Sequence, residues 1–166
     1  MRPVALFDAM TRFWRITLEK LALDKKCDGA RTQGGRWNPV GVPALYAGTT
    51  PEICALEKFV HLAGVGHPSF KLVAIDAPDS TDLIYAPAHA DLPLDWAAIP
   101  PSADAQVFGK AWLEAATHLV MLVPSAVIPE ARNAVINPLH PEYRNATLKI
   151  IRDFTFDARM FKGNFL

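Results

Sequence analysis

The sequence predicts an α+β fold in which a mixed or antiparallel sheet is combined with two or three helices. Short β-branched or aromatic segments recur along the chain, and two segments combine helix start signals with helical spacing of apolar residues. Turns rich in Pro, Gly and Asn separate these segments. At 166 residues the chain has the length of one domain, so residues 1–166 are expected to share a single hydrophobic core.

Strands are expected where short apolar segments are rich in β-branched and aromatic residues or alternate in polarity. These segments are residues 12–16, 44–48, 70–75, 81–85, 118–123, 126–128, 134–136 and 149–151, followed by the alternating residues 154–156. In the first strand, a period of two places Trp14 and Ile16 on one face. Phe13 and Arg15 are then expected on the opposite face.

The first helix is expected from Pro51 to about Leu62, ending near Gly64. Thr49 can cap its start, and Glu52 follows three residues later, as in a capping box. Pro51 falls in the first turn, where proline is well tolerated. The sequence therefore predicts a helix directly after the second strand.

The second helix is expected from its N-cap, Ser102, to about Ala116. Its apolar residues recur at helical spacing and would form one buried face, composed of Val107, Phe108, Ala111, Trp112 and Ala115. The preceding residues, 86–101, are rich in Pro, Ala and Asp and are expected to be irregular.

Residues 24–43 are also expected to be mostly loop, because they contain several glycines and prolines among polar residues. A short strand is expected around Arg36 and Trp37. A loop of this length inside a compact domain is unusual, and long ordered loops tend to be functional.

Composition narrows the functional classes. Acidic and basic residues number 17 each, which argues against a protein that grips nucleic-acid phosphates. Cys27 and Cys54 have neither CxxC spacing nor neighbouring histidine pairs, so they are expected to be reduced thiols, and no metal site is expected. The first residues reach Asp8 before a signal-peptide core can form, and no apolar run has membrane-spanning length. We therefore expect a cytoplasmic protein without membrane or direct nucleic-acid partners.

Glu57 is the most informative polar residue, because it lies beside the apolar face of the first expected helix. Two interpretations remain open. Glu57 is either a carboxylate at the edge of the core or a functional acid. In both cases a buried carboxylate needs a partner, and the obvious candidates are Arg15, Arg31 and Arg36.

Arg36 follows Gly34 and Gly35, and a guanidinium on such a permissive backbone can clamp a phosphate with two hydrogen bonds. A loop arginine paired with a surface acid fits the same pattern, and both interpretations also apply to Arg15 and Arg31. The glycines belong neither to a Walker loop nor to a GxGxxG fingerprint, because the chain contains no such motif. A Rossmann site is therefore excluded.

Tyr46 and Ser125 complete the set of candidate site residues. Tyr46 lies in the expected strand before the Glu57 helix, where its ring either presents a flat face for stacking on a ligand or fills the core. Ser125 follows a buried strand and is either a site residue or a plain turn serine. It lacks a GxSxG elbow and a histidine in triad order, so we interpret it as a hydrogen-bonding residue and not as a nucleophile.

Taken together, these residues resemble the RES domain, which is the toxin half of bacterial RES–Xre toxin–antitoxin pairs. The ordered set comprises Trp14-Arg15-Ile16, Gly34-Gly35-Arg36-Trp37-Asn38 with Gly41, Leu45-Tyr46-Ala47, Ala55-Leu56-Glu57 with His61, the Trp112 helix, Val123-Pro124-Ser125-Ala126, Asn133, Asn137-Pro138, His140-Pro141 and Phe156-Asp157-Ala158-Arg159. The resemblance extends from about Phe13 to Arg159. Residues 86–101 are the least matched part.

The resemblance implies a fold similar to that of ADP-ribosyltransferase toxins, with NAD bound as substrate in a cleft of the sheet and no metal. It assigns catalytic roles to Glu57, Arg36 and Tyr46, and cofactor contacts to Arg15, Arg36, Tyr46, Ser125, Arg31 and Asn133. Within this set, Glu57 would be the acid and Tyr46 would pack on nicotinamide. Arg15 and Arg36 would hold NAD phosphates or ribose, while Arg31 and Asn133 would lie at the rim.

The implied reaction breaks the bond between nicotinamide and ribose, which builds positive charge on the sugar that a nearby carboxylate stabilises. ADP-ribose then passes to a bacterial protein, or NAD is lost to water or phosphate, and an Xre-type antitoxin would block the cleft. Two other functions are considered. One is a non-catalytic binding module that acts through its partner. The other is a ribonuclease, which the neutral charge and the lack of a basic aromatic patch disfavour.

Overall fold

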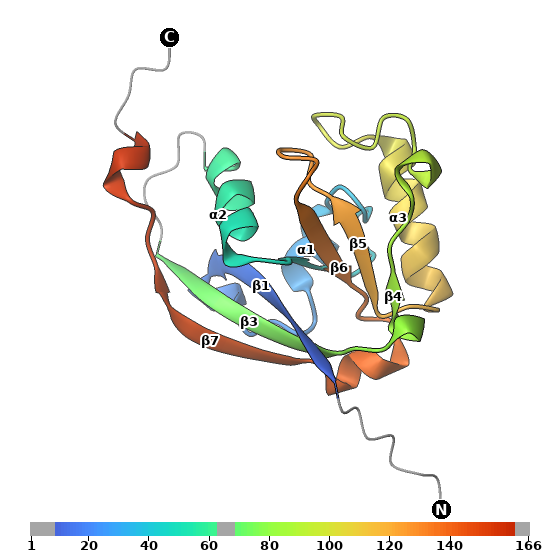
Figure 1. Ribbon diagram of the computed structural model, residues 1–166, viewed down its shortest axis with the longest axis horizontal. Helices are drawn as coiled ribbons and strands as arrows, with labels where there is room; N and C mark the ends of the chain where they lie inside the picture. The colour runs from blue at the N-terminus through green and yellow to red at the C-terminus, as the bar shows by residue number, and fades with distance from the viewer. Residues whose placement is uncertain (1–8, 63–68, 162–166) are drawn as a thin grey trace, which may run out of the picture.

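The computed structural model describes residues 9–62 and 69–161, and its centre is a seven-stranded mixed sheet (Figure 1). The strands are β1 (Met10–Leu18), β2 (Leu45–Gly48), β3 (Phe70–Pro78), β4 (Ile84–Tyr85), β5 (Val120–Pro124), β6 (Arg132–Ile136) and β7 (Thr147–Phe154). Their spatial order is β4-β5-β6-β2-β1-β3-β7. β4 and β5 run parallel, whereas the other neighbours pair antiparallel. The predicted α+β class is therefore confirmed.

Three α-helices accompany the sheet in the described residues, and they are α1 (Asp28–Gln33), α2 (Pro51–Val60) and α3 (Ala103–Ala115). The short 3-10 helices are η1 (Glu19–Leu21), η2 (Thr81–Leu83), η3 (His89–Asp91), η4 (Pro141–Asn145) and η5 (Ala158–Phe161). Figure 1 shows α2 and α3 over different halves of the sheet. No helix in this part of the chain combines the length and apolar character needed to cross a membrane.

Three clusters of buried side chains hold the elements together. The largest spans the sheet and includes Phe13, Leu45, Val73, Ile75, Leu119 and Ile136. A second cluster attaches α3 and residues 86–101 to β5 and β6, and includes Trp37, Trp96, Trp112, Leu113, Met121 and Val135. The third lies under α2 and is formed by Ile16, Cys54, Phe70 and Leu72. Because Ile16 and Phe13 belong to different clusters, the predicted alternation of faces along the first strand is confirmed.

The junction between β1 and β2 is the weakest pairing in the middle of the sheet. Their register contains the single pair Trp14 and Gly48, whereas β1 pairs with β3 along its whole length. α2 begins three residues after β2 ends and contacts both strands. Since few ladder hydrogen bonds hold β1 against β2, the two strands can diverge beneath α2. This arrangement leaves room for the cavity described below.

The predicted helix after β2 exists, but its cap is one residue later than expected. The Thr50 side chain accepts a hydrogen bond from the Ile53 N–H at 3.3 Å, and Pro51 is the first helical residue. The Thr49 hydroxyl instead donates to the Arg132 carbonyl at 3.0 Å, which ties the start of α2 to β6. The helix ends at Val60, two residues before the expected Leu62, and Gly64 lies outside the described residues.

Residues 24–43 are not simply loop, because α1 lies within them. The carboxylate of Asp24 accepts hydrogen bonds from the backbone N–H groups of Lys26 and Asp28, and Cys27 adopts a left-handed conformation with φ of 57° just before the helix. These local contacts start a six-residue helix that has no apolar periodicity to reveal it. The expected strand around Arg36 is also wrong, since only an isolated bridge from Gly35 to Asn38 forms there.

The buried face of α3 differs from the predicted one. Ser102 is the N-cap as expected, but Val107 is 66% exposed, and the buried positions are Ala105, Gly109, Trp112 and Leu113. The helix rotates this way because Gly109 packs directly on the backbone of Trp37. A pattern built from large side chains missed a contact made by small ones.

Two further expected strands are wrong, one directly after β5 and one directly before β4. Residues 126–128 form a bend between β5 and β6, in which the N–H groups of Val127 and Ile128 donate to the Ser125 hydroxyl. Residues 81–83 form a 3-10 helix, so only Ile84 and Tyr85 join the sheet. In the expected segment 154–156, only Phe154 belongs to a strand, because β7 ends there. The remaining expected strands correspond to β1, β2, β3, β5, β6 and β7.

Candidate functional site

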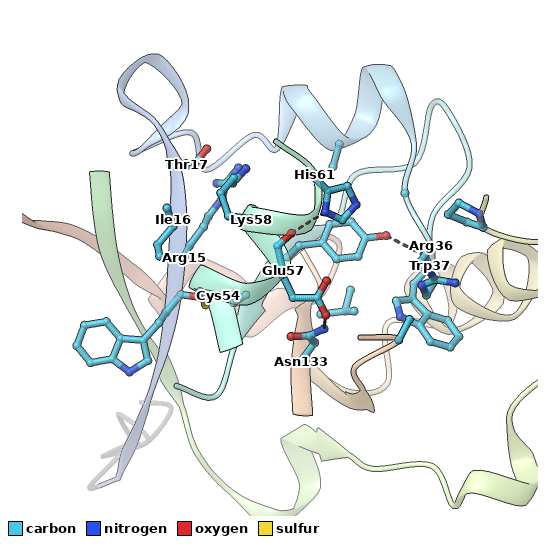
Figure 2. Close-up of a pocket in the computed structure, with 18 of the residues that line it drawn as sticks. Arg15, Ile16, Thr17, Arg36, Trp37, Cys54, Glu57, Lys58, His61 and Asn133 are labelled. Atoms are coloured by element: carbon cyan, nitrogen blue, oxygen red, sulfur yellow. Dashed lines mark hydrogen bonds between the residues drawn. The ribbon is translucent and has the colours of Figure 1, made fainter. Parts of the chain in front are cut away.

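A cavity of about 540 Å³ lies between β1, β2, α2 and the loop that follows α1 (Figure 2). The residues that line it are Trp14, Arg15, Ile16, Thr17, Ala30, Gly34, Gly35, Arg36, Trp37, Tyr46, Ala47, Cys54, Glu57, Lys58, His61, Pro101, Pro124, Ala126, Asn133 and Val135. Cavities of this size hold small molecules with several functional groups. Five of the seven predicted site residues, Arg15, Arg36, Tyr46, Glu57 and Asn133, are among these lining residues.

Glu57 projects from α2 into the cavity and is held by two neutral donors. Its Oε1 accepts a hydrogen bond from Ser125 Oγ at 2.7 Å and another from Asn133 Nδ2 at 2.6 Å. Arginines were the expected partners, and that expectation is wrong, because no arginine forms an ion pair with Glu57 among the described residues. Both hydrogen bonds end on the same oxygen, so Oε2 remains available within the described structure to face a ligand.

Ser125 is fully buried, and the surrounding backbone sets its orientation. Its hydroxyl oxygen accepts hydrogen bonds from the N–H groups of Val127 at 3.0 Å and Ile128 at 3.2 Å. Since both acceptor positions are taken, the hydroxyl hydrogen is left to donate to Glu57. Ser125 therefore orients the carboxylate from behind instead of lining the cavity.

Asn133 reaches Glu57 from the sheet. It pairs in register with Gly48 of β2 and with Val123 of β5, so its backbone is fixed on both sides. Asn133 was expected at the rim, and the structure instead gives it a direct hydrogen bond to the acid. This connection joins α2 to the middle of the sheet.

Arg36 lies in the glycine-rich loop after α1 and is attached to the 86–101 segment. Its Nη1 donates to the carbonyl oxygens of Trp96 at 2.7 Å and Ala98 at 2.8 Å. Partial burial lowers the pKa of Arg36, while the charge of Glu57 acts in the opposite direction. The guanidinium of Arg36 therefore interacts electrostatically with the Glu57 carboxylate across the cavity without a hydrogen bond between them.

Tyr46 holds the loop in place through its hydroxyl group. The hydroxyl accepts a hydrogen bond from the Trp37 N–H at 2.9 Å and donates to Asn38 Oδ1 at 2.6 Å. Burial raises the pKa of Tyr46, so the phenol stays neutral. A Cβ on Gly35 would lie only 2.6 Å from this hydroxyl, which explains the need for glycine there. The expected stacking of the ring on nicotinamide stays a prediction.

Arg31 lies apart from the cavity residues. It forms an exposed ion pair with Asp28 at 2.6 Å within α1, and it does not line the cavity. Both cysteines are free thiols, as predicted. Cys54 lines the cavity and donates to the Trp14 carbonyl at 2.9 Å, and burial raises its pKa to about 12. In the described residues, no group of His, Cys, Asp and Glu side chains is placed to hold a metal ion.

Sequence reasoning missed three polar side chains at the site. Lys58 follows Glu57 directly and lines the cavity. His61, known from the sequence only as part of a motif, donates a hydrogen bond from Nδ1 to the backbone carbonyl of Glu57 at 2.6 Å. Gln106 of α3 donates to the Gly35 carbonyl at 3.0 Å and thereby supports the loop. A lysine or glutamine on a helix is ordinarily a solvated residue, so the sequence held no signal for Lys58 or Gln106.

The α+β fold holds one carboxylate, that of Glu57, in a cavity through hydrogen bonds from neutral donors. This arrangement is typical of an enzyme that acts on a small molecule. The family model for the RES domain matches residues 12–157, and the chain therefore belongs to the RES family. The curated relatives that it matches include "Prs ADP-ribosylating toxin" of Sphingobium sp. (strain YBL2), 36% identical, with 92% of this chain and 98% of the relative covered. Another is "Toxin Res" of Photorhabdus laumondii, 34% identical, with 81% and 86% covered.

A solved structure confirms the fold. The crystal structure of the M. tuberculosis MbcT–MbcA toxin–antitoxin complex contains a chain that superposes with a TM-score of 0.65 at 21% identity. The match covers 93% of this chain and 88% of that chain. The architecture is thus shared beyond the range in which the sequences are closely similar.

Proposed function

We propose that this protein is the toxin of a toxin–antitoxin pair and that it cleaves the bond between the nicotinamide and the ribose of NAD. The observation that carries the proposal is the Glu57 carboxylate, oriented in the cavity by Ser125 and Asn133. Membership of the RES family supports it, as do relatives named as toxins, one of them as an ADP-ribosylating toxin. The family model covers most of the chain, which supports one RES domain over residues 1–166.

The chemistry needs a negative charge next to the ribose at the moment the bond breaks. Departure of nicotinamide leaves an oxocarbenium-like sugar, which a fixed carboxylate stabilises more than it stabilises the ground state. Ser125 and Asn133 are neutral, so they orient Glu57 without cancelling its charge. The free Oε2 is the atom that would face the developing cation.

The other proposed contacts surround this centre. Tyr46 would pack against the nicotinamide ring, and Arg15 and Arg36 would engage phosphate or ribose groups. The exposed position of Arg31 would allow contact only with a part of NAD, or of an acceptor, that extends beyond the cavity. Ser125 would act through Glu57, since it lies behind the carboxylate and its own hydrogen-bonding capacity is filled.

Two outcomes of the cleavage are proposed, transfer of ADP-ribose to a bacterial protein or loss of NAD to water or phosphate. The name of the Sphingobium relative favours transfer. An Xre-type antitoxin that covers the cavity is the proposed partner, and the toxin–antitoxin complex of the M. tuberculosis protein supports the existence of such a partner.

The deciding experiment measures nicotinamide release from NAD by the purified chain and by its Glu57→Gln variant. Glutamine keeps an oxygen that can accept from Ser125 and Asn133, so this variant removes charge while preserving the fold. Glu114→Gln is the matched control, because Glu114 is an exposed acid on α3. Reactions with and without phosphate, and with labelled NAD plus bacterial lysate, identify the acceptor.

We expect the parent chain and the Glu114→Gln control to release nicotinamide. In Glu57→Gln the rate of release should fall by at least about a hundredfold, which is the effect of removing one preorganised electrostatic contact. Label on a lysate protein identifies a transferase, and free turnover identifies a glycohydrolase or phosphorylase. If no nicotinamide is released and no label is transferred to a protein, the enzymatic proposal is wrong, and a non-catalytic binding module becomes the better account.

A further inference from the structure

Positively charged side chains lie on both sides of Glu57 in the cavity (Figure 2). Arg15 from β1 and Lys58 from α2 lie next to each other on one side, and Arg36 lies on the other. Lys58 belongs to none of the motifs that resemble the RES domain. A dinucleotide carries its two phosphates next to each other, so a single end of the cavity should receive both, and the two ends can be compared.

The Arg36 end is already partly committed to protein groups. Two carbonyl oxygens, those of Trp96 and Ala98, accept hydrogen bonds from Nη1 at 2.7 and 2.8 Å. The Trp96 ring stacks on Trp37 at 6.4 Å with an interplanar angle of 12°, which fixes these carbonyls. Part of the donor fork of Arg36 is therefore used to hold the cavity wall.

Among residues 9–62 and 69–161, the Arg15–Lys58 pair has no comparable partners. The best protein contact of Arg15 is a long hydrogen bond from Nη1 to the Leu21 carbonyl at 3.4 Å, and the Lys58 ammonium lies 5.6 Å from the Phe70 ring centroid. Neither side chain forms an ion pair within the described residues. Burial lowers the pKa of both, and the charge of Arg15 lowers that of Lys58 further.

Nearby acids do not neutralise this pair. Asp24 acts on Arg15 through its charge, but its carboxylate oxygens accept hydrogen bonds from the backbone N–H groups of Lys26 and Asp28. Glu57 is turned toward Ser125. Two adjacent, partly buried cations without a bonded carboxylate are unfavourable in the free chain, and an anion that bridges them would relieve both desolvation and repulsion.

We infer that Arg15 and Lys58 form a binding subsite for the diphosphate of a dinucleotide, with Lys58 as a specificity residue for that group. This subsite rests on the proposed function and adds to it the orientation of the dinucleotide in the cavity. The diphosphate lies toward β1, the nicotinamide ribose lies at Glu57, and Arg36 lies beyond the ribose on the side away from the diphosphate. Because Lys58 directly follows Glu57 on α2, a single residue step along the helix, a rise of about 1.5 Å, sets the spacing between the anion subsite and the acid.

The test measures binding without turnover, so that it is independent of the cleavage reaction. Calorimetry gives the Kd of the parent chain, Lys58→Gln, Lys58→Arg and Lys110→Gln for two probes. ADP-ribose contains the diphosphate, whereas nicotinamide riboside does not. Lys110 is an exposed lysine on α3 and serves as the charge-matched control.

We expect Lys58→Gln to raise the Kd for ADP-ribose about tenfold, the order expected for one charge-assisted hydrogen bond, and to leave that for nicotinamide riboside unchanged. Lys58→Arg should restore binding of ADP-ribose, and Lys110→Gln should have no effect. Unchanged affinity of Lys58→Gln for ADP-ribose would refute the subsite, and so would equal losses for both probes. A chain that binds ADP-ribose through Lys58 but releases no nicotinamide would retain the subsite and refute only the enzymatic proposal.

Discussion

Replacing Gly109 by alanine should separate α3 from the loop that carries Arg36. An alanine Cβ at this position would lie 1.9 Å from the carbonyl oxygen of Trp37 and 2.7 Å from its Cα, well inside the 3.4 Å at which ordinary contact begins. The obstacle is backbone and not a flexible side chain, so relief requires the helix or the loop to move. Overpacking of this kind costs roughly 1–3 kcal/mol, and a forced backbone shift places the substitution toward the upper end.

Helix propensity acts in the other direction, since alanine in a helix interior is favoured over glycine by about 1 kcal/mol. The net expectation is a free energy of unfolding lowered by about 2 kcal/mol, or a Tm lowered by about 4–8 °C in a chain of this size. Urea denaturation followed by tryptophan fluorescence measures the change. Nicotinamide release should fall as well, because the loop that shifts also carries Arg36.

Gly29→Ala is the matched control, because it makes the same chemical change in α1. There the added Cβ would lie 3.5 Å from the nearest atom, Leu21 Cδ1, which is ordinary van der Waals contact. This variant should be as stable as the parent or more stable by up to about 1 kcal/mol. If Gly109→Ala proves as stable as Gly29→Ala, α3 does not approach the backbone of Trp37 this closely.

Three further outcomes are expected. Tyr46→Phe should lower the free energy of unfolding by about 1–3 kcal/mol in urea melts, because the amide of Trp37 and the Asn38 side chain each lose a partner; an unchanged midpoint would contradict this. Burial raises the pKa of Cys54 from 9.0 to about 12, so its contribution to stability is complete below pH 9 and is lost as the pH rises toward 12. Unfolding measured between pH 8 and 11 should show this loss, and Cys54→Ala should reduce the slope. Ser102→Ala should cost about 1 kcal/mol through loss of the α3 cap, with Ser102→Gly costing less; equal midpoints for Ser102→Ala and the parent would exclude a role for the cap.

Elements with strong local signals could be predicted from the sequence, and elements set by distant contacts could not. β1 was recognisable from alternation, and α2 from Pro51 and the threonines before it. α1 was missed because it is started by Asp24 and a left-handed Cys27, neither of which gives an apolar period. The buried face of α3 was misplaced because Gly109, which has no side chain to count, makes its closest contact.

The candidate site shows the same division. The types of residue were available from the resemblance to the RES domain, but their mutual contacts were not. Ser125 and Asn133 are 68 and 76 positions from Glu57 in the sequence. They reach it because Asn133 is in register with Gly48, three residues before α2 begins, and because β5 ends beside β6. A register is a property of the assembled sheet, which local sequence patterns do not contain.

The error about the partners of Glu57 bears on the mechanism. Arginines were expected because a buried carboxylate is most simply satisfied by a cation. In the proposed reaction, a bonded arginine would neutralise the charge that the ribose cation needs and would remove the electrostatic attraction that Glu57 is proposed to supply. The structure resolves the conflict with Ser125 and Asn133, which meet the hydrogen-bonding requirement of one oxygen and leave the net charge intact. Arg36 remains close enough to feel Glu57 but is tied to carbonyls of the opposite wall. The cationic groups of the cavity are thus kept off the acid, and in the proposed arrangement Arg15 and Lys58 receive the anionic part of the substrate.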